Sequence, residues 1–94
     1  MSTDGQYVTK LLGANVRRKR TALDLTQEEL AERVDVETRS LQRVEQGVQF
    51  PSAAVLARLA QALHVPVHAL FKPTTAPKRP PGRPTKRSSA MRVR

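Results

Sequence analysis

The chain has 94 residues, enough for one small domain. Its formal net charge is +9 and it has no cysteine, so a polyanion is the expected partner and disulfides and thiolate metal sites are excluded. With two histidines, eight acidic residues and no Gly-rich phosphate loop or nucleophile–base arrangement, we expect no enzyme, no cofactor and no metal site. The chain shows neither a secretory signal nor an apolar run near the about 20 residues of a membrane span, so we expect a cytoplasmic protein without a membrane partner.

The positive charge is concentrated toward the C-terminus. Residues 72–94 contain eight Lys and Arg residues and no acid, whereas residues 1–71 carry a net charge of +1. Five of the seven prolines also lie in this segment, and such a sequence buries too little apolar surface to offset the entropy of ordering. We therefore expect a flexible N-terminus (1–7), a folded domain (8–71) and a disordered tail rich in Pro, Lys and Arg (72–94).

Three helices are predicted in the first half of the domain. Apolar residues at helical spacing favour a first helix over about residues 9–23. The sequence Thr26-Gln27-Glu28-Glu29 is a capping box, from which a second helix is expected to run to about Val34. A third helix fits about residues 38–46, with Gly47 as its C-terminal cap.

Two further helical elements complete an all-α fold. Ser52 is expected to cap a fourth helix that ends near Leu63, and a short fifth element is expected near Val67–Phe71, after Pro66. The fourth helix is apolar nearly all round, which predicts burial on several sides. It is either the central helix of a small core or a helix that also faces a second subunit.

The second and third helices are joined by a short turn around Asp35, and such a pair can lay its second helix in a DNA major groove about 12 Å wide. Leu41 and Val44 mark the inward side of the third helix. The opposite side has side chains that can bond base edges, namely Arg39, Gln42, Arg43 and Gln46. The alternative interpretation of this set is a solvated helix face.

Several short motifs occur together in the order Leu12-Gly13, Val16-Arg17, Arg20, Leu25-Thr26-Gln27-Glu28-Glu29-Leu30-Ala31, Val36, Val44-Glu45-Gln46-Gly47, Pro51-Ser52 and Ala62-Leu63-His64-Val65. In combination they resemble the Cro/C1-type (XRE-family) helix-turn-helix domain over about residues 11–71. The resemblance implies a five-helix, lambda-repressor-like domain that binds operator DNA, usually as a homodimer.

The resemblance also implies roles for individual residues. The implied base-reading residues are Thr38, Arg39, Gln42 and Arg43. The implied contacts to the DNA backbone come from Gln27, Ser40, Gln46 and the Gly47 amide. Arg20 and Glu45 match an ion pair that ties the first helix to the end of the recognition helix, and burial at the edge of the inward face gives Glu45 the same need for a partner.

The sequence departs from the family pattern at four positions. Asp24, Asp35 and His64 stand where family members commonly have glycine, and a backbone angle φ above zero is expected at all three. Glu37 stands where the family usually has Ser or Thr as the N-cap of the recognition helix. Its carboxylate suits the helix dipole but opposes a nearby phosphate.

The basic tail resembles an AT-hook, in which an Arg-Gly-Arg-Pro core lies in the minor groove of A·T-rich DNA. Here Pro81 replaces the first core arginine. The residues expected to contact DNA are Lys78, Arg79, Gly82, Arg83, Lys86 and Arg87. A nonspecific phosphate-binding arm and a solubilising tail are the alternatives.

These features together predict a sequence-specific regulator of transcription that binds double-stranded DNA as a homodimer and associates with the nucleoid. One alternative is an antitoxin that represses its own operon, and another is a nucleoid-associated architectural protein in which the tail dominates. A protein partner, either a toxin or a polymerase, is left open. His64 and His68 lie four residues apart, but Pro66 separates them and no third ligand is near, so a helix-end residue and a surface residue are expected instead of a metal site.

Overall fold

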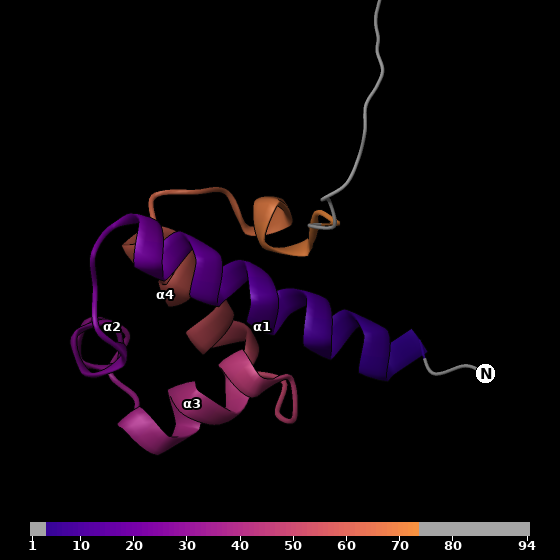
Figure 1. Cartoon of the computed structure of the whole chain (residues 1–94), viewed down its shortest axis with the longest axis horizontal. Helices are drawn as coiled ribbons and strands as arrows, with labels where there is room; N and C mark the ends of the chain where they lie inside the picture. Colours follow the sequence, from indigo (N-terminus) through magenta and orange to yellow (C-terminus); the bar gives the residue numbers. More distant parts are fainter. Residues whose placement is uncertain (1–3, 74–94) are drawn as a thin grey trace, which may run out of the picture.

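The computed structural model describes residues 4–73, which form four α-helices and one short 3-10 helix (Figure 1). These elements are α1 (Asp4–Ala22), α2 (Gln27–Arg33), α3 (Thr38–Gln46), α4 (Ala53–Ala62) and η1 (Val67–Phe71). The expected all-α architecture is confirmed for this part of the chain. The short fifth element lies at Val67–Phe71 as predicted, but it is a 3-10 helix of five residues and not an α-helix, so the domain has four α-helices and not five.

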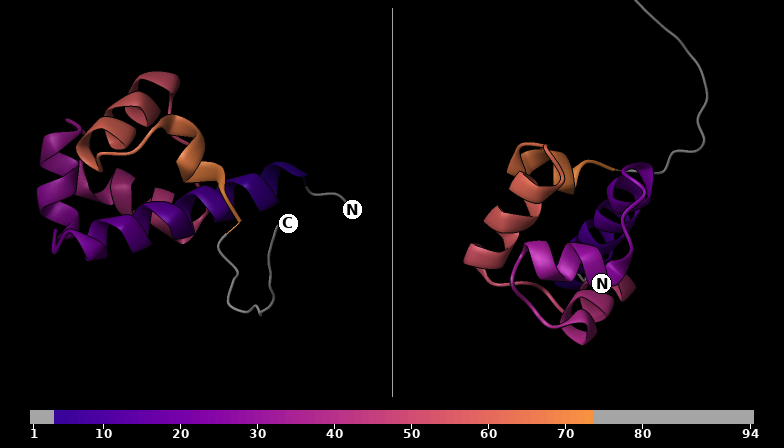
Figure 2. Two further views of the ribbon diagram at one scale, coloured as in Figure 1. Left: turned by 90° about the horizontal axis from the view of Figure 1, so that it is seen from above. Right: turned by 90° about the vertical axis from the view of Figure 1, so that its left-hand side faces the viewer.

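Helix α1 begins earlier than predicted. It starts at Asp4 instead of about residue 9, so residues 4–7 of the expected flexible N-terminus are helical. Gly5, Gln6, Tyr7 and Val8 are all exposed, and the start of the apolar periodicity therefore carried no information about these turns. They project beyond the rest of the bundle (Figures 1 and 2).

The core is made by one side of each helix and by η1. Its fully buried members come from every element and are Leu12, Val16, Leu30, Ala31, Val34, Leu41, Leu59, Ala60, Leu63 and Leu70. Helix α4 is less enclosed than predicted. Ala53, Ala54 and Ala57 are exposed, so α4 packs through one side and not through several.

Three helices end in the left-handed residues expected from the sequence. Asp24, Asp35 and His64 have φ angles of 59°, 60° and 62°. In each case the next amide bonds back to a carbonyl five residues earlier, for example Val36 N to Ala31 O at 3.0 Å. This is the Schellman pattern, which uses carbonyls that a helix end leaves free. The sharp α2–α3 turn is therefore built from backbone hydrogen bonds.

Helix α1 lies between α3 and η1 (Figures 1 and 2). It crosses α3 at Gly13, where an added Cβ would lie 2.3 Å from the carbonyl oxygen of Val44. On its other side, the fully buried Asn15 donates through Nδ2 to the carbonyls of Leu70 and Lys72, both at 2.8 Å. Helix α1 therefore holds α3 on one side and the C-terminal end of the domain, at Leu70 and Lys72, on the other.

Candidate nucleic-acid interface

Helix α3 has a polar side that faces solvent and an apolar side that packs in the core. Leu41 and Val44 are 1% and 3% exposed, as predicted for the inward side. The exposed side chains of the helix are those of Arg39, Gln42, Arg43 and Gln46. Thr38 and Ser40 are half-buried on the two flanks of this surface. The structure thus brings the expected base-reading residues together along one surface of one helix, with Thr38 at its edge.

The two ends of α3 are capped differently. Glu37 occupies the N-cap position, and its side chain makes no capping hydrogen bond. Gly47 caps the other end with φ 79°, and an added Cβ there would lie 2.9 Å from Cγ of Lys10. Its amide donates to the carbonyl oxygen of Val44 at 3.0 Å. The Gly47 amide is therefore bonded within the helix end in this structure, and its contact to the DNA backbone stays a prediction.

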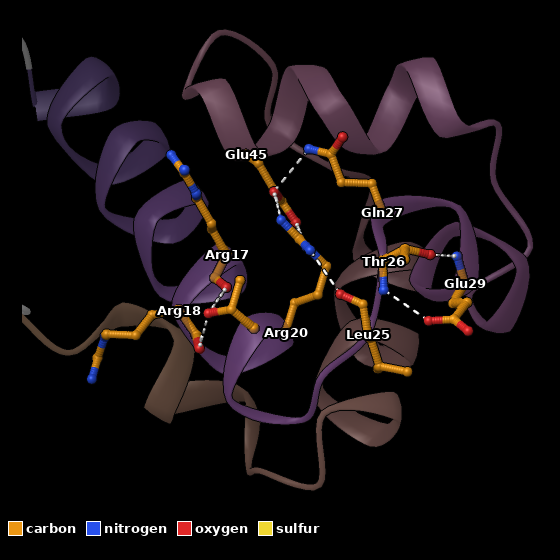
Figure 3. A network of polar contacts seen from close by, with 9 residues as sticks. Arg17, Arg18, Arg20, Leu25, Thr26, Gln27, Glu29 and Glu45 are labelled. Carbon is orange, nitrogen blue, oxygen red and sulfur yellow. Dashed lines mark hydrogen bonds and ion pairs between the residues drawn. The ribbon is translucent and has the colours of Figure 1, made fainter.

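A polar network joins α1, α2 and α3 behind the exposed surface (Figure 3). Arg20 of α1 donates to both carboxylate oxygens of Glu45, from Nε at 2.6 Å and from Nη2 at 3.0 Å. Gln27 donates through Nε2 to the same carboxylate at 3.0 Å, and Arg20 also reaches the carbonyl of Leu25 at 2.7 Å. The Glu45 carboxylate thus ties the last turn of α3 to the other two helices.

Burial makes this network sensitive to loss of one partner. The side chains of Arg20 and Glu45 are only 11% and 3% exposed. The hydrogen bond to Glu45 raises the pKa of Arg20 above its ordinary value, more than burial lowers it. The guanidinium is therefore held in its charged form, and it neutralises Glu45 at the base of α3.

The capping box at the start of α2 forms as predicted. The Thr26 hydroxyl accepts from the amide of Glu29 at 3.0 Å, and the Glu29 carboxylate accepts from the amide of Thr26 at 2.8 Å. Both bonds appear in Figure 3. They fix the first turn of α2, and therefore the place from which Gln27 reaches Glu45.

Two residues of α1 were not assigned a role from the sequence. Asn15 stands among the apolar residues of α1, but its partners lie 55 and 57 residues away, so only its polarity on the inward side gave a signal. Arg17 lies three residues before Arg20 and borders the network just described. That i, i+3 spacing places both arginines on one side of α1 and is visible in the sequence.

The remaining site predictions concern metals, membranes and the tail. His64 and His68 are both exposed, and residues 4–73 contain no group of three side chains suited to a metal ion. None of the helices in that range has the length and apolar character needed to cross a membrane. The predicted tail contacts at Lys78, Arg79, Gly82, Arg83, Lys86 and Arg87 lie outside the described residues.

Comparison with known proteins places the domain. A family model described as a helix-turn-helix domain matches residues 11–70. An uncharacterized transcriptional regulator in the ATPase CF(0) region of Rhodospirillum rubrum is 42% identical over 65 residues, which cover 69% of this chain and 60% of that protein. An uncharacterized HTH-type transcriptional regulator of Mycobacterium tuberculosis is 35% identical over 76% of this chain and 51% of its own. The chain thus spans between half and two thirds of the length of these relatives.

Solved structures agree with the family match. The clp gene regulator ClgR from Corynebacterium glutamicum is 32% identical, with a TM-score of 0.65 over 67% of each chain. The restriction-modification controller protein C.AhdI from Aeromonas hydrophila is also 32% identical, with a TM-score of 0.64 over 67% of this chain and 96% of its own. The chain therefore belongs to the family of Cro/C1-type helix-turn-helix DNA-binding proteins.

Proposed function

We propose that this protein is a sequence-specific regulator of transcription that binds double-stranded DNA with α3 in the major groove. The observation that carries this proposal is the exposed surface of α3, on which Arg39, Gln42 and Arg43 lie over a helix fixed from behind by Glu45. Relatives and structural neighbours named as regulators support it.

The exposed surface of α3 suits base reading. A guanidinium can donate two hydrogen bonds to O6 and N7 of guanine, and a glutamine amide can bond N6 and N7 of adenine. Arg39 and Arg43 take the first role in this proposal, and Gln42 takes the second. Thr38, half-buried at the start of the helix, reaches the edge of the same groove.

Contacts to the DNA backbone come from the borders of that surface. Gln46 extends the exposed side of α3 toward its C-terminal end, and Ser40 lies on one flank. The side-chain Nε2 of Gln27 donates to Glu45. The side-chain oxygen and the backbone N–H of Gln27 remain for solvent or phosphate. Such contacts fix the register of the protein on DNA and carry no sequence information themselves.

We place the homodimer contact at η1 and the neighbouring loop. Val67 is 41% exposed and Phe50 is 48% exposed, and the Phe50 ring stacks on Phe71 with 6.3 Å between centroids. A second copy would remove this apolar surface from water. Val67→Asp should then shift the protein to monomer in analytical ultracentrifugation while its helix content is unchanged.

The basic tail is assigned an auxiliary role on its sequence alone. Its charge of +8 suits phosphate binding, and its Pro-Gly-Arg-Pro core suits the minor groove of A·T-rich DNA less well than a complete hook. The tail would raise affinity for all DNA, while α3 selects the sequence.

In vitro selection from a random duplex library tests the proposal. The full chain should enrich a motif with two related half-sites whose centres lie about one helical turn, or a multiple of it, apart. A chain lacking residues 74–94, which keeps the Lys72 carbonyl for Asn15, should enrich the same motif without any flanking A·T preference. Enrichment of A·T content alone, with no motif, would contradict the proposal and favour an architectural protein.

A further inference from the structure

An open depression of about 400 Å³ lies where α1, the start of α2 and the end of α3 meet. The residues that line it are all polar or charged, namely Arg17, Arg20, Gln27, Glu45 and Gln46. Glu45 and Arg20 form its base, because their side chains are nearly buried. Arg17 and Gln46 are exposed at its border.

Among the residues that line this depression, Arg17 is the charged group without an ion-pair partner in the described range 4–73. Glu45 is neutralised by Arg20, and its Oε1 atom already accepts from both Arg20 and Gln27. Arg17 makes no ion pair and donates no side-chain hydrogen bond to any residue of the described range 4–73. Figure 3 shows Arg17 and Gln27 on either side of Glu45, with no interaction drawn from the Arg17 guanidinium. The residues that line the depression therefore carry a net charge of +1, and Glu28 of α2 is the further charge that acts on Arg20.

The border of the depression is continuous with the base-reading surface. Gln46 lies three residues after Arg43 and seven after Arg39, so the three side chains share one side of α3. A group bound between Gln46 and Arg17 would therefore lie beside DNA held by α3. The most abundant anion at that place is a phosphate of the DNA backbone.

We propose that Arg17 and Gln46 together hold one phosphate of the bound DNA, over the neutralised Arg20–Glu45 pair. This inference rests on the proposed function and adds a DNA-contact residue on α1. A guanidinium suits the position because its planar fork donates two parallel hydrogen bonds to a phosphate. Gln46 can donate a further bond through its amide, which has no protein partner within residues 4–73.

The test compares Arg17→Ala with Arg33→Ala in the full chain. Arg33 is an exposed arginine in the last turn of α2, outside the depression, so its removal changes net charge by the same amount. Arg17→Ala should weaken binding about tenfold or more and reduce the slope of log K against log salt by about 0.9 for each protomer. Arg33→Ala should change the slope little, and both variants should keep the wild-type Tm.

Measurement on two duplexes separates this inference from the proposed function. Because a phosphate contact carries no sequence information, the slope should fall on the selected site and on random DNA alike. Equal slopes for the two variants would overturn the phosphate contact even if the wild type prefers one sequence. If Arg17→Ala reduces the salt slope but the wild type prefers no sequence, sequence-specific regulation is overturned and the phosphate contact stands. If the wild type binds no duplex, both the phosphate contact and the proposed function are overturned. A lowered Tm in Arg17→Ala with an unchanged slope would assign Arg17 to folding and also overturn the contact.

A neutral phosphate analogue locates the contact. Methylphosphonate is placed at single positions of the selected site. At one position it should weaken binding of the wild type but leave the affinity of Arg17→Ala unchanged. Arg17→Lys keeps the charge but not the two-bond fork, so it should recover the salt slope and only part of the affinity. Identical methylphosphonate profiles for the wild type and Arg17→Ala would contradict the proposal.

Discussion

Replacing either Arg20 or Glu45, the two members of the buried ion pair, should destabilise the domain more than replacing any exposed charged residue. Without Glu45, the guanidinium of Arg20 keeps the Leu25 carbonyl as its one partner among residues 4–73, and the Gln27 amide loses its acceptor. Removing one member of a buried pair costs about 3–5 kcal/mol, a large share of the about 5–15 kcal/mol that keeps a native domain folded. Side-chain exposures of 11% and 3% place this pair in that class.

A double-mutant cycle measures the interaction itself. We choose Glu45→Met and Arg20→Met, which keep much of the side-chain volume and remove the acceptor and the donor, so that each single variant removes the interaction. Two direct hydrogen bonds in a buried network predict a coupling free energy of about 2–3 kcal/mol. Urea unfolding followed by far-UV circular dichroism is the assay, because the chain has no tryptophan and its one tyrosine is exposed.

The control for the cycle is an exposed acid on the same part of the fold. Glu32→Gln on α2 should change the free energy of unfolding by no more than about 0.5 kcal/mol. A coupling energy below about 0.5 kcal/mol between Arg20 and Glu45 would refute the reasoning. It would mean that packing of α1 on α3, and not this pair, fixes the recognition helix.

Two further predictions concern α1 and the tail. Gly13→Ala should lower Tm by several degrees, because the added Cβ would lie 2.3 Å from a backbone oxygen of α3. Gly5→Ala in the same helix meets no atom within 4 Å and should raise the free energy of unfolding by up to about 1 kcal/mol. Thermal unfolding followed by circular dichroism compares the two variants, and equal effects would contradict the close crossing of α1 and α3. Deleting residues 74–94 removes a charge of +7 and leaves Lys72 in place as an acceptor for Asn15. The salt slope should fall by several units while the preferred site is kept, and an unchanged slope would show that the tail does not touch DNA.

Features fixed by neighbouring residues could be predicted from the sequence. The capping box at Thr26, the extent of α3 and the inward positions of Leu41 and Val44 all follow from patterns within a few residues. The left-handed helix end at Asp35 could be predicted as well, once the resemblance placed a glycine position there.

Features that depend on distant residues could not be predicted. The first residues of α1 contribute no side chain to the buried core, and Tyr7 and Val8 are 58% and 37% exposed, so apolar periodicity gave little signal for the start of this helix. Asn15 bonds carbonyls at the other end of the domain, and the Phe50–Phe71 stack joins a loop to η1.

The central claim is that α3 reads base sequence, and a specificity ratio tests it most directly. The measurement is the Kd on random duplex divided by the Kd on the selected site, at one salt concentration, for the wild type, Arg43→Ala and Arg33→Ala. The wild-type ratio should be about 10³ or more. Arg43→Ala should lower it about 5- to 150-fold, corresponding to about 1–3 kcal/mol for a two-bond base contact, and Arg33→Ala should leave it unchanged. Equal weakening of both Kd values by Arg43→Ala would contradict base reading and reduce this surface of α3 to a phosphate-binding face.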